Sequence, residues 1–192
     1  MSTRPPGRSG GDGANAQRAG HPLRAARAYV ALGSNLAHPR RQVARALRAL
    51  ERLPGTRLAR VSRNYRTAPM GAPEPQPDYV NAVAELTTRL APRALLARLF
   101  AIERRQQRRR DAGAPRNAAR TLDLDLLLYD RRRMSTATLT LPHPRMHERA
   151  FVLRPLLDVA PFARIPRRGL ARRLLHSVRA QRIAPTRRHF LH

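Results

Sequence analysis

The chain has no lysine and no cysteine, and only 4% of its 192 residues are aromatic. Its 39 basic side chains are therefore all arginines, which outnumber the 12 acidic ones and give a formal net charge of +27. Without lysine, the chain cannot form a Schiff base or supply the lysine of a phosphate-binding P-loop. Without cysteine, it has no disulfide, no thiolate metal site and no cysteine nucleophile.

Long apolar runs are also missing, because no segment approaches the roughly 20 residues that cross a membrane. Residues 1–27 are rich in glycine, serine, arginine and alanine, and they lack the apolar stretch of a secretory signal. Their composition is similar to that of an arginine-rich transit peptide, but we favour a disordered basic extension. These absences fit a cytoplasmic enzyme that does not enter a membrane.

The excess of arginine has two interpretations. The planar guanidinium binds phosphate through two parallel hydrogen bonds, so the bias is compatible with a nucleotide or nucleic-acid partner. A GC-rich coding sequence would equally replace lysine by arginine throughout, without any partner. A dedicated nucleic-acid-binding protein would be expected to show base-stacking aromatics or a known binding motif, and neither is evident. We therefore expect only weak, salt-sensitive nucleic-acid binding through the basic ends.

The pattern of apolar residues predicts one folded domain, residues 28–161, and a basic tail of unknown role, residues 162–192. Strands and helices are intermixed, and several strands lie close enough in sequence to pair antiparallel, which predicts an α+β fold with a mainly antiparallel sheet covered by helices. The expected strands are residues 28–32, 56–66, 79–87, 138–141 and one that ends at Tyr129. The expected helices begin near residues 39 and 92 and span about 146–153 and 170–178, and Pro155 is expected to end or restart the third.

The most informative segment is RTLDLDLL, in which two aspartates interrupt a run of leucines. Side chains alternate between the two faces of a strand, so Asp123 and Asp125 share one face. The leucines expected on the other face are Leu122, Leu124, Leu126 and Leu128. The carboxylates lie roughly 6–7 Å apart along the backbone, which suits two Mg²⁺ ions bound to a polyphosphate. The alternative is a solvated strand face whose acids have no function.

Three further side chains stand out by their place in a pattern. In the strand expected at residues 79–87, alternation puts Tyr79 and Asn81 on the same face, so an aromatic ring and an amide point together. In the helix that begins near Pro92, Glu103 continues an otherwise apolar stripe, which is unusual for a carboxylate.

Six short motifs occur in a defined order: GSN after the first strand, then YRTAPMG, PDYVNAV, RTLDLDLL, LPHPRM and ERAFVLRPL. In this order and spacing they resemble the 6-hydroxymethyl-7,8-dihydropterin pyrophosphokinase family of folate biosynthesis, over roughly residues 28–161. The resemblance implies a ferredoxin-like core with helices packed on both faces. It also implies that the protein, which we expect to be a monomer, transfers pyrophosphate from ATP to 6-hydroxymethyl-7,8-dihydropterin and releases AMP.

The resemblance assigns residues around the phosphates of ATP. Asp123 and Asp125 match the metal ligands, with two Mg²⁺ ions as cofactors. The residues that match phosphate-contacting, catalytic positions are Arg108, Arg110, Arg120, His143 and Arg149. Arginine stays protonated, so its expected role is electrostatic rather than proton transfer. In a chain so rich in arginine, surface charge is the alternative for each arginine, and a structural role is the alternative for His143.

Pterin recognition needs a flat slot with hydrogen-bonding groups at its edge. The residues that match pterin-binding positions of the family are Thr67, Ala68, Met70, Tyr79, Asn81 and Phe151. The resemblance implies that the two rings stack on the pterin, that the amide pairs with its edge and that residues 67–70 offer main-chain groups. Core packing is the alternative for the two rings. Glu103 matches an acid near the active site, with a buried salt bridge to a neighbouring arginine as the alternative.

The sequence departs from the family pattern at two places. The segment 110–120, expected to close over ATP and exclude water, is longer than usual and has Asn117 where some members have tryptophan. Pro144 replaces an aromatic residue found after the histidine in some members. A nucleotidyltransferase would also need paired aspartates, but the set of Tyr79, Asn81 and Phe151 argues against that activity.

Overall fold

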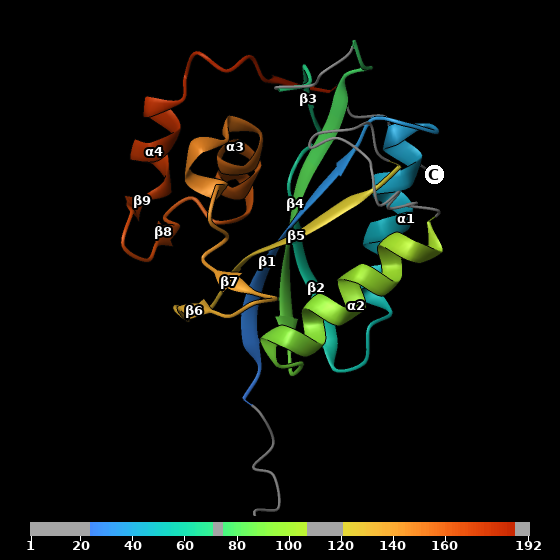
Figure 1. Cartoon of the computed structure of the whole chain (residues 1–192), viewed down its shortest axis with the longest axis vertical. Coiled ribbons are helices and arrows are strands. Elements are labelled where there is room, and N and C mark those ends of the chain that lie inside the picture. Colours follow the sequence, from blue (N-terminus) through green and yellow to red (C-terminus); the bar gives the residue numbers. More distant parts are fainter. Residues whose placement is uncertain (1–23, 71–74, 107–120, 187–192) are drawn as a thin grey trace, which may run out of the picture.

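The computed structural model describes residues 24–70, 75–106 and 121–186. Most of the expected basic extension and all of the 110–120 loop lie outside the described residues. Figure 1 shows a sheet with helices on both sides. Its strands are β1 (Ala26–Ser34), β2 (Thr56–Val61), β3 (Tyr65–Thr67), β4 (Tyr79–Thr88), β5 (Asp123–Tyr129) and β10 (Ala184–Pro185). The helices are α1 (Pro39–Glu51), α2 (Pro92–Arg105), α3 (Ala150–Val159), α4 (Ala171–Ser177) and the 3₁₀ turn η1 (Met146–Glu148).

Strand β4 organises the sheet. It pairs with β1 on one side and with β2 and then β3 on the other, and every pairing is antiparallel. β1 also pairs with β5, and β10 pairs with β3, so the order across the sheet is β10, β3, β4, β1, β5. Two short hairpins, β6 (Met134–Ser135) with β7 (Thr140–Leu141) and β8 (Arg164–Ile165) with β9 (Gly169–Leu170), lie outside it. The expected α+β fold with an antiparallel sheet is confirmed.

Alternation along the strands divides the apolar side chains between two cores. Val30 of β1 and Ala82 of β4 lie in the core that includes residues of α1 and α2. Tyr29 and Val83, their neighbours along the same strands, lie in the core that includes residues of α3 and α4. Figure 1 shows the two helix pairs on opposite sides of the sheet. Because successive strand residues point to opposite faces, each strand supplies both cores, and the prediction of helices on both faces is confirmed.

The pattern between residues 56 and 66 predicted one strand, but the structure divides it into β2 and β3. At the break, the N–H of Ser62 donates to the carbonyl of Val83 at 2.9 Å. The Ser62 hydroxyl accepts from the N–H of Val83, also at 2.9 Å. A side-chain oxygen therefore takes the place of a main-chain carbonyl in the ladder, and both strands follow the same edge of β4.

One expectation for β5 is wrong. Leu124 and Leu126 lie in the core shared with α1 and α2, as predicted, but Leu128 lies in the opposite core. The register between β1 and β5 shifts at this point, since Tyr29 pairs with Leu128 whereas Val30 pairs with Leu126. Leu127 is the extra residue of a β-bulge, and the bulge reverses the alternation beyond it.

The helix expected at residues 146–153 is in fact the turn η1 followed by α3. Helix α3 continues through Pro155 to Val159, so the expectation that this proline ends or restarts a helix is wrong. Proline removes one main-chain hydrogen bond from the helix. Leu153, Leu156 and Val159 are buried against the sheet, and their burial outweighs that loss.

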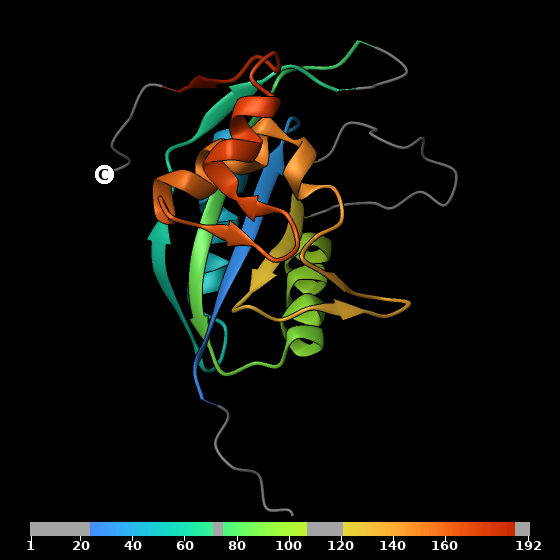
Figure 2. The ribbon, with the colours of Figure 1, turned by 90° about the vertical axis from the view of Figure 1, so that its left-hand side faces the viewer.

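The described part of the basic segment after residue 161 folds onto the rest of the domain. Helix α4, which agrees with the helix expected near residues 170–178, packs on α3. β10 adds a strand to the sheet beside β3. Figure 2 shows α4 and the β8–β9 hairpin over the face that carries α3, with β10 near β3. In the residues described, none of the helices has the length and apolar character to span a membrane.

Candidate active site

A cavity of about 230 Å³ lies between the sheet and the start of α3, and small side chains of β1 form its floor. Gly33 pairs with Asn81 of β4 on one side and with Asp123 of β5 on the other. Ala31, on the same face, pairs with Asp125. Because these two central residues are so small, the acids of β5 and the amide of β4 face each other across open space rather than across a filled core.

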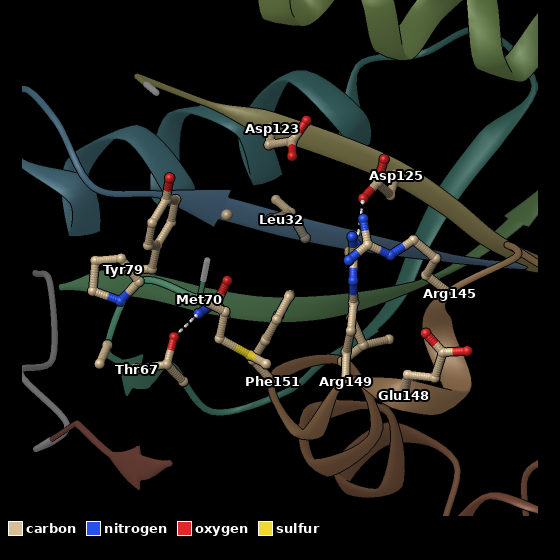
Figure 3. Close-up of a pocket in the computed structure, with 16 residues that line it drawn as sticks. Leu32, Thr67, Met70, Tyr79, Asp123, Asp125, Arg145, Glu148, Arg149 and Phe151 are labelled. Atoms are coloured by element: carbon tan, nitrogen blue, oxygen red, sulfur yellow. Dashed lines mark hydrogen bonds and ion pairs between the residues drawn. The ribbon is translucent and has the colours of Figure 1, made fainter. Parts of the chain in front are cut away.

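The carboxylates of β5 form one wall. Asp123 and Asp125 lie two residues apart in the strand and both line the cavity, as alternation predicted. The Asp125 side chain is 34% exposed, and its Oδ2 lies 3.9 Å from both Arg149 Nη1 and His143 Nε2. Figure 3 shows both aspartates on β5, with Arg149 reaching toward Asp125 from α3. Oxygen ligands on one face, open to solvent, are the donor set that Mg²⁺ prefers.

His143 is held against the edge of β5. The main-chain N–H of His143 donates to the carbonyl of Leu127 at 2.9 Å. The ring Nδ1 of His143 accepts from the main-chain N–H of Arg145 at 3.3 Å. With Nδ1 as an acceptor, the hydrogen of the neutral ring is on Nε2, which faces Asp125. Burial, together with the charges of Arg149 and Arg145, lowers the pKa of His143 to about 4, against an opposing effect of Asp123. The ring is therefore a neutral hydrogen-bond donor at pH 7.

Arg149 and Phe151 enter the cavity from the start of α3. Arg149 is the residue before the helix, in extended conformation, and its guanidinium carbon lies 5.5 Å from the centre of the Phe151 ring. This arrangement is a cation–π contact. It keeps the arginine side chain on the same side of the helix as the ring, which is half-buried and lines the cavity.

The opposite wall comes from β3, β4 and the residues between them. The amide nitrogen of the buried Asn81 donates to Thr67 Oγ1 at 2.9 Å. Its Oδ1 is therefore turned toward the floor, where a Cβ added at Gly33 would lie only 3.2 Å away. Tyr79 lines the same wall, and its hydroxyl donates to Gln76 Oε1 at 3.4 Å. Ala68 and Met70 complete this side, with Met70 47% exposed.

The structure thus brings most of the predicted site residues into one cavity. The predicted residues that line it are Thr67, Ala68, Met70, Tyr79, Asn81, Asp123, Asp125, Arg149 and Phe151, with His143 beside Asp125. Arg108, Arg110 and Arg120 lie outside the described residues. Glu103 lies elsewhere: it is buried on α2, and its Oε1 accepts from the N–H of Leu124 at 2.8 Å, on the main chain between the two aspartates.

Sequence reasoning missed several residues that shape the site. Arg145 and Glu148 line the cavity beside the LPHPRM motif. The GSN motif also has a structural role, since Ser34 Oγ donates to the carbonyl of Thr121 at 2.6 Å and the amide of Asn35 donates to the carbonyl of Pro77 at 3.2 Å. The turn after β1 therefore holds the segments that lead into β5 and β4. The signal available in the sequence was a pair of polar residues, Ser34 and Asn35, directly after an apolar run.

The sequence of the chain matches a known protein family. The family model for 7,8-dihydro-6-hydroxymethylpterin-pyrophosphokinase matches residues 29–161. A 2-amino-4-hydroxy-6-hydroxymethyldihydropteridine pyrophosphokinase of Pseudomonas aeruginosa is 54% identical over 140 residues, which are 73% of this chain and 84% of that protein. The protein of the same name from Haemophilus influenzae is 47% identical over 133 residues, 69% of this chain and 81% of that protein.

Among solved structures, the fold is similar to that of Plasmodium falciparum HPPK-DHPS, with a TM-score of 0.61 at 12% identity. That alignment covers 80% of this chain and 44% of the other, so this chain spans less than half of that longer protein. The family match covers the strands and helices that build the cavity. The chain therefore belongs to the 7,8-dihydro-6-hydroxymethylpterin-pyrophosphokinase family.

Proposed function

We propose that the cavity described above is where this pyrophosphokinase binds its two substrates and joins them. The enzyme transfers pyrophosphate from ATP to 6-hydroxymethyl-7,8-dihydropterin, giving AMP and the pterin diphosphate, a step of folate biosynthesis. The observation that carries the proposal is the separation of the two walls. The carboxylates lie on the β5 side of Gly33 with Arg149 and His143 beside them, and the Asn81 amide and the Tyr79 ring lie on the β4 side. The Phe151 ring enters from α3 beside Arg149.

We assign the pterin to the wall of β3 and β4. A fused ring needs apolar surface on its faces and hydrogen-bonding groups at its edge. Tyr79 of this wall and Phe151 of α3 supply rings, and the Asn81 amide is held in one orientation by its bond to Thr67. The orientation leaves Oδ1 toward the cavity as an acceptor for the pterin edge. Residues 67–70 line the same slot, and we propose that their main-chain groups contact the pterin.

We assign the phosphates of ATP to the wall of β5. Arg149 supplies a fixed positive charge within 3.9 Å of Asp125, and His143 supplies a neutral Nε2–H donor at the same distance. In a partly closed site, such groups stabilise the charge that develops when the pterin hydroxyl attacks the β-phosphorus. We propose that Arg108, Arg110 and Arg120 add to this charge.

Asp123 and Asp125 fit a magnesium site. The family uses ATP, generally with Mg²⁺. Within the described residues, no group of three or more acidic, histidine or cysteine side chains forms a metal cage of protein ligands alone. Mg²⁺ is commonly bound by one or two carboxylates and completed by water and substrate phosphates, so two open carboxylates are a sufficient protein contribution. We propose that the two carboxylates hold two Mg²⁺ ions. The positive charge of the ions offsets the negative charge of the phosphate oxygens.

The test is formation of AMP from ATP, Mg²⁺ and 6-hydroxymethyl-7,8-dihydropterin. The wild-type protein is expected to form AMP only when the pterin is present, and Asp125→Ala is expected to reduce AMP to background. Glu51→Ala, at an exposed acid on α1, serves as the matched control and is expected to retain full activity. Wild-type AMP formation no higher than that of Asp125→Ala would refute the assignment of the cavity.

We further propose that the protein acts as a monomer in the cytoplasm. The net charge of +27 supports weak, salt-sensitive nucleic-acid binding as a secondary property. An RNA affinity that persists at 200 mM salt would contradict it and would indicate a dedicated nucleic-acid partner instead.

A further inference from the structure

The segment after α4 returns to the active site and contacts both of its walls. We call residues 181–186 the C-terminal strap. At one end of the strap, Gln181 makes two hydrogen bonds beside Arg149. At the other end, β10 pairs with β3, and the N–H of Thr186 donates to the carbonyl of Asn64 at 2.8 Å. β3 ends at Thr67, which lines the cavity, so the strap connects the wall assigned to phosphate with the wall assigned to the pterin.

The side-chain amide of Gln181 spans the main chain on either side of Arg149. Its Oε1 accepts from the N–H of Ala150 at 2.8 Å, and its Nε2 donates to the carbonyl of Glu148 at 2.7 Å. One amide therefore fixes the residue before Arg149 and the residue after it. Gln181 itself is half-buried, and its N–H donates to the carbonyl of Val178 at 3.0 Å at the end of α4.

The hydrogen bonds of Gln181 lie at the N-terminus of α3, which has no capping side chain of its own. The first N–H groups of a helix have no partner within the helix and are usually satisfied by a short side chain that accepts a hydrogen bond at the N-cap. The N-cap of α3 is Arg149, whose guanidinium has only donors and cannot accept such a bond. Arg149 makes no side-chain capping bond, and Gln181 supplies an acceptor for the first N–H of the helix, that of Ala150. Arg149 is thereby left to direct its side chain at Asp125.

We propose that Gln181 is a positioning residue of the active site, which acts by holding the main chain of residues 148–150 so that Arg149 reaches the phosphate wall. The inference rests on the proposed function of Arg149. Loss of both hydrogen bonds frees the turn between η1 and α3. A displacement of about 1 Å at a catalytic group can cost up to about 100-fold in rate, so we expect a loss of about tenfold in kcat.

The test variant is Gln181→Met, which preserves the length of the side chain and removes both hydrogen bonds. Arg182→Met, at the exposed neighbour, is the matched control and is expected to keep kcat within about twofold. The assay measures kcat and the KM for each substrate, and thermal unfolding is followed in parallel. If the Met variant does not fold, Gln181→Glu keeps the acceptor for Ala150, loses the donor to Glu148 and is expected to show a loss in kcat.

A double-mutant cycle with Arg149→Ala separates positioning from a general structural effect. Gln181→Met is expected to lower kcat about tenfold beside an intact Arg149 and by less than about twofold in the Arg149→Ala background. Equal factors in both backgrounds, or an unchanged kcat beside Arg149, would overturn the positioning role. If Arg149→Ala alone keeps full kcat, the assignment of Arg149 to phosphate fails, and the role of Gln181 fails with it. If Arg149→Ala lowers kcat while Gln181→Met leaves it unchanged, only the positioning role is lost.

Discussion

Gly33 and Asn81 face each other across adjacent strands, and a methyl group at position 33 would lie 3.2 Å from Asn81 Oδ1. The absence of a side chain at Gly33 is thus part of the binding slot. The same methyl would lie 4.0 Å from Cβ of Asp123, so Gly33 keeps the two walls of the site apart.

We predict that Gly33→Ala raises the KM for the pterin about tenfold, because crowding of a packed site costs about 1–3 kcal/mol and 1.4 kcal/mol is a factor of ten. The KM for ATP is expected to change much less. Steady-state kinetics with each substrate varied in turn would measure both values. An unchanged KM for the pterin in a variant that melts like the wild type would show that the pterin does not lie over Gly33.

Asp125→Asn preserves the shape of the side chain and removes its charge. We predict a loss of about 100-fold in kcat, by analogy with the removal of one electrostatic group from an active site, and a higher Mg²⁺ concentration for half-maximal rate. A magnesium titration of the initial rate would measure both effects. Asp130→Asn is the control, because Asp130 lies at the turn after β5 and accepts from the N–H of Arg27, which asparagine can also do. A normal magnesium titration for Asp125→Asn would rule out Asp125 as a metal ligand.

His143→Ala removes the neutral donor beside Asp125. We predict a fall of about tenfold in kcat/KM for ATP, since a hydrogen bond to a charged group contributes about 1.5–3 kcal/mol and water replaces part of it. His143→Gln, which carries an N–H donor, is expected to recover part of the loss. His176→Ala on α4, next to Arg179, is the control and is expected to have no effect. An unchanged kcat and nucleotide affinity in His143→Ala would make this histidine structural.

Asp158 connects α3 to β3. The buried hydroxyl of Tyr65 donates to its Oδ2 at 2.8 Å, and the N–H of Arg63 donates to the same oxygen at 3.2 Å. Burial alone would raise the pKa of Asp158, but the hydrogen bonds from Arg63 and Tyr65 lower it below the usual 3.8. A carboxyl whose pKa is depressed by folding stabilises the folded state above its unfolded pKa, and this contribution is lost as the pH falls through the folded pKa.

We therefore predict that Asp158→Asn lowers the free energy of unfolding by about 1–2 kcal/mol at pH 7. The difference from the wild type is expected to shrink as the pH falls below about 4. Urea unfolding at pH 7, 5, 4 and 3 would measure it. Tyr65→Phe, which leaves the carboxylate and removes one donor, is expected to give a smaller loss. A difference that stays constant down to pH 3 would show that the charge of Asp158 contributes nothing.

Alternation alone was enough to place the acids of β5 correctly. Asp123 and Asp125 share a face because a strand has a period of two, and Tyr79 and Asn81 share one for the same reason. The same rule misplaced Leu128, because a bulge at Leu127 depends on how β5 pairs with β1. Alternation in the sequence therefore predicts which side chains of a strand share a face, up to the first β-bulge. The position of a bulge depends on how the strand pairs with its neighbour.

The sequence by itself determined the class of fold, the acids and the family motifs, since these depend on the identity and spacing of nearby residues. Only the tertiary structure decided that Gly33 forms the floor between two walls, that Glu103 holds the main chain of Leu124 and that Gln181 supports Arg149. Gln181 lies 31 residues beyond Ala150, in a segment without a clear pattern. Its role depends on the first N–H of α3, which has no partner within the helix, and on a side-chain acceptor that packing brings close to it. No local pattern in the sequence predicts that these two groups come together.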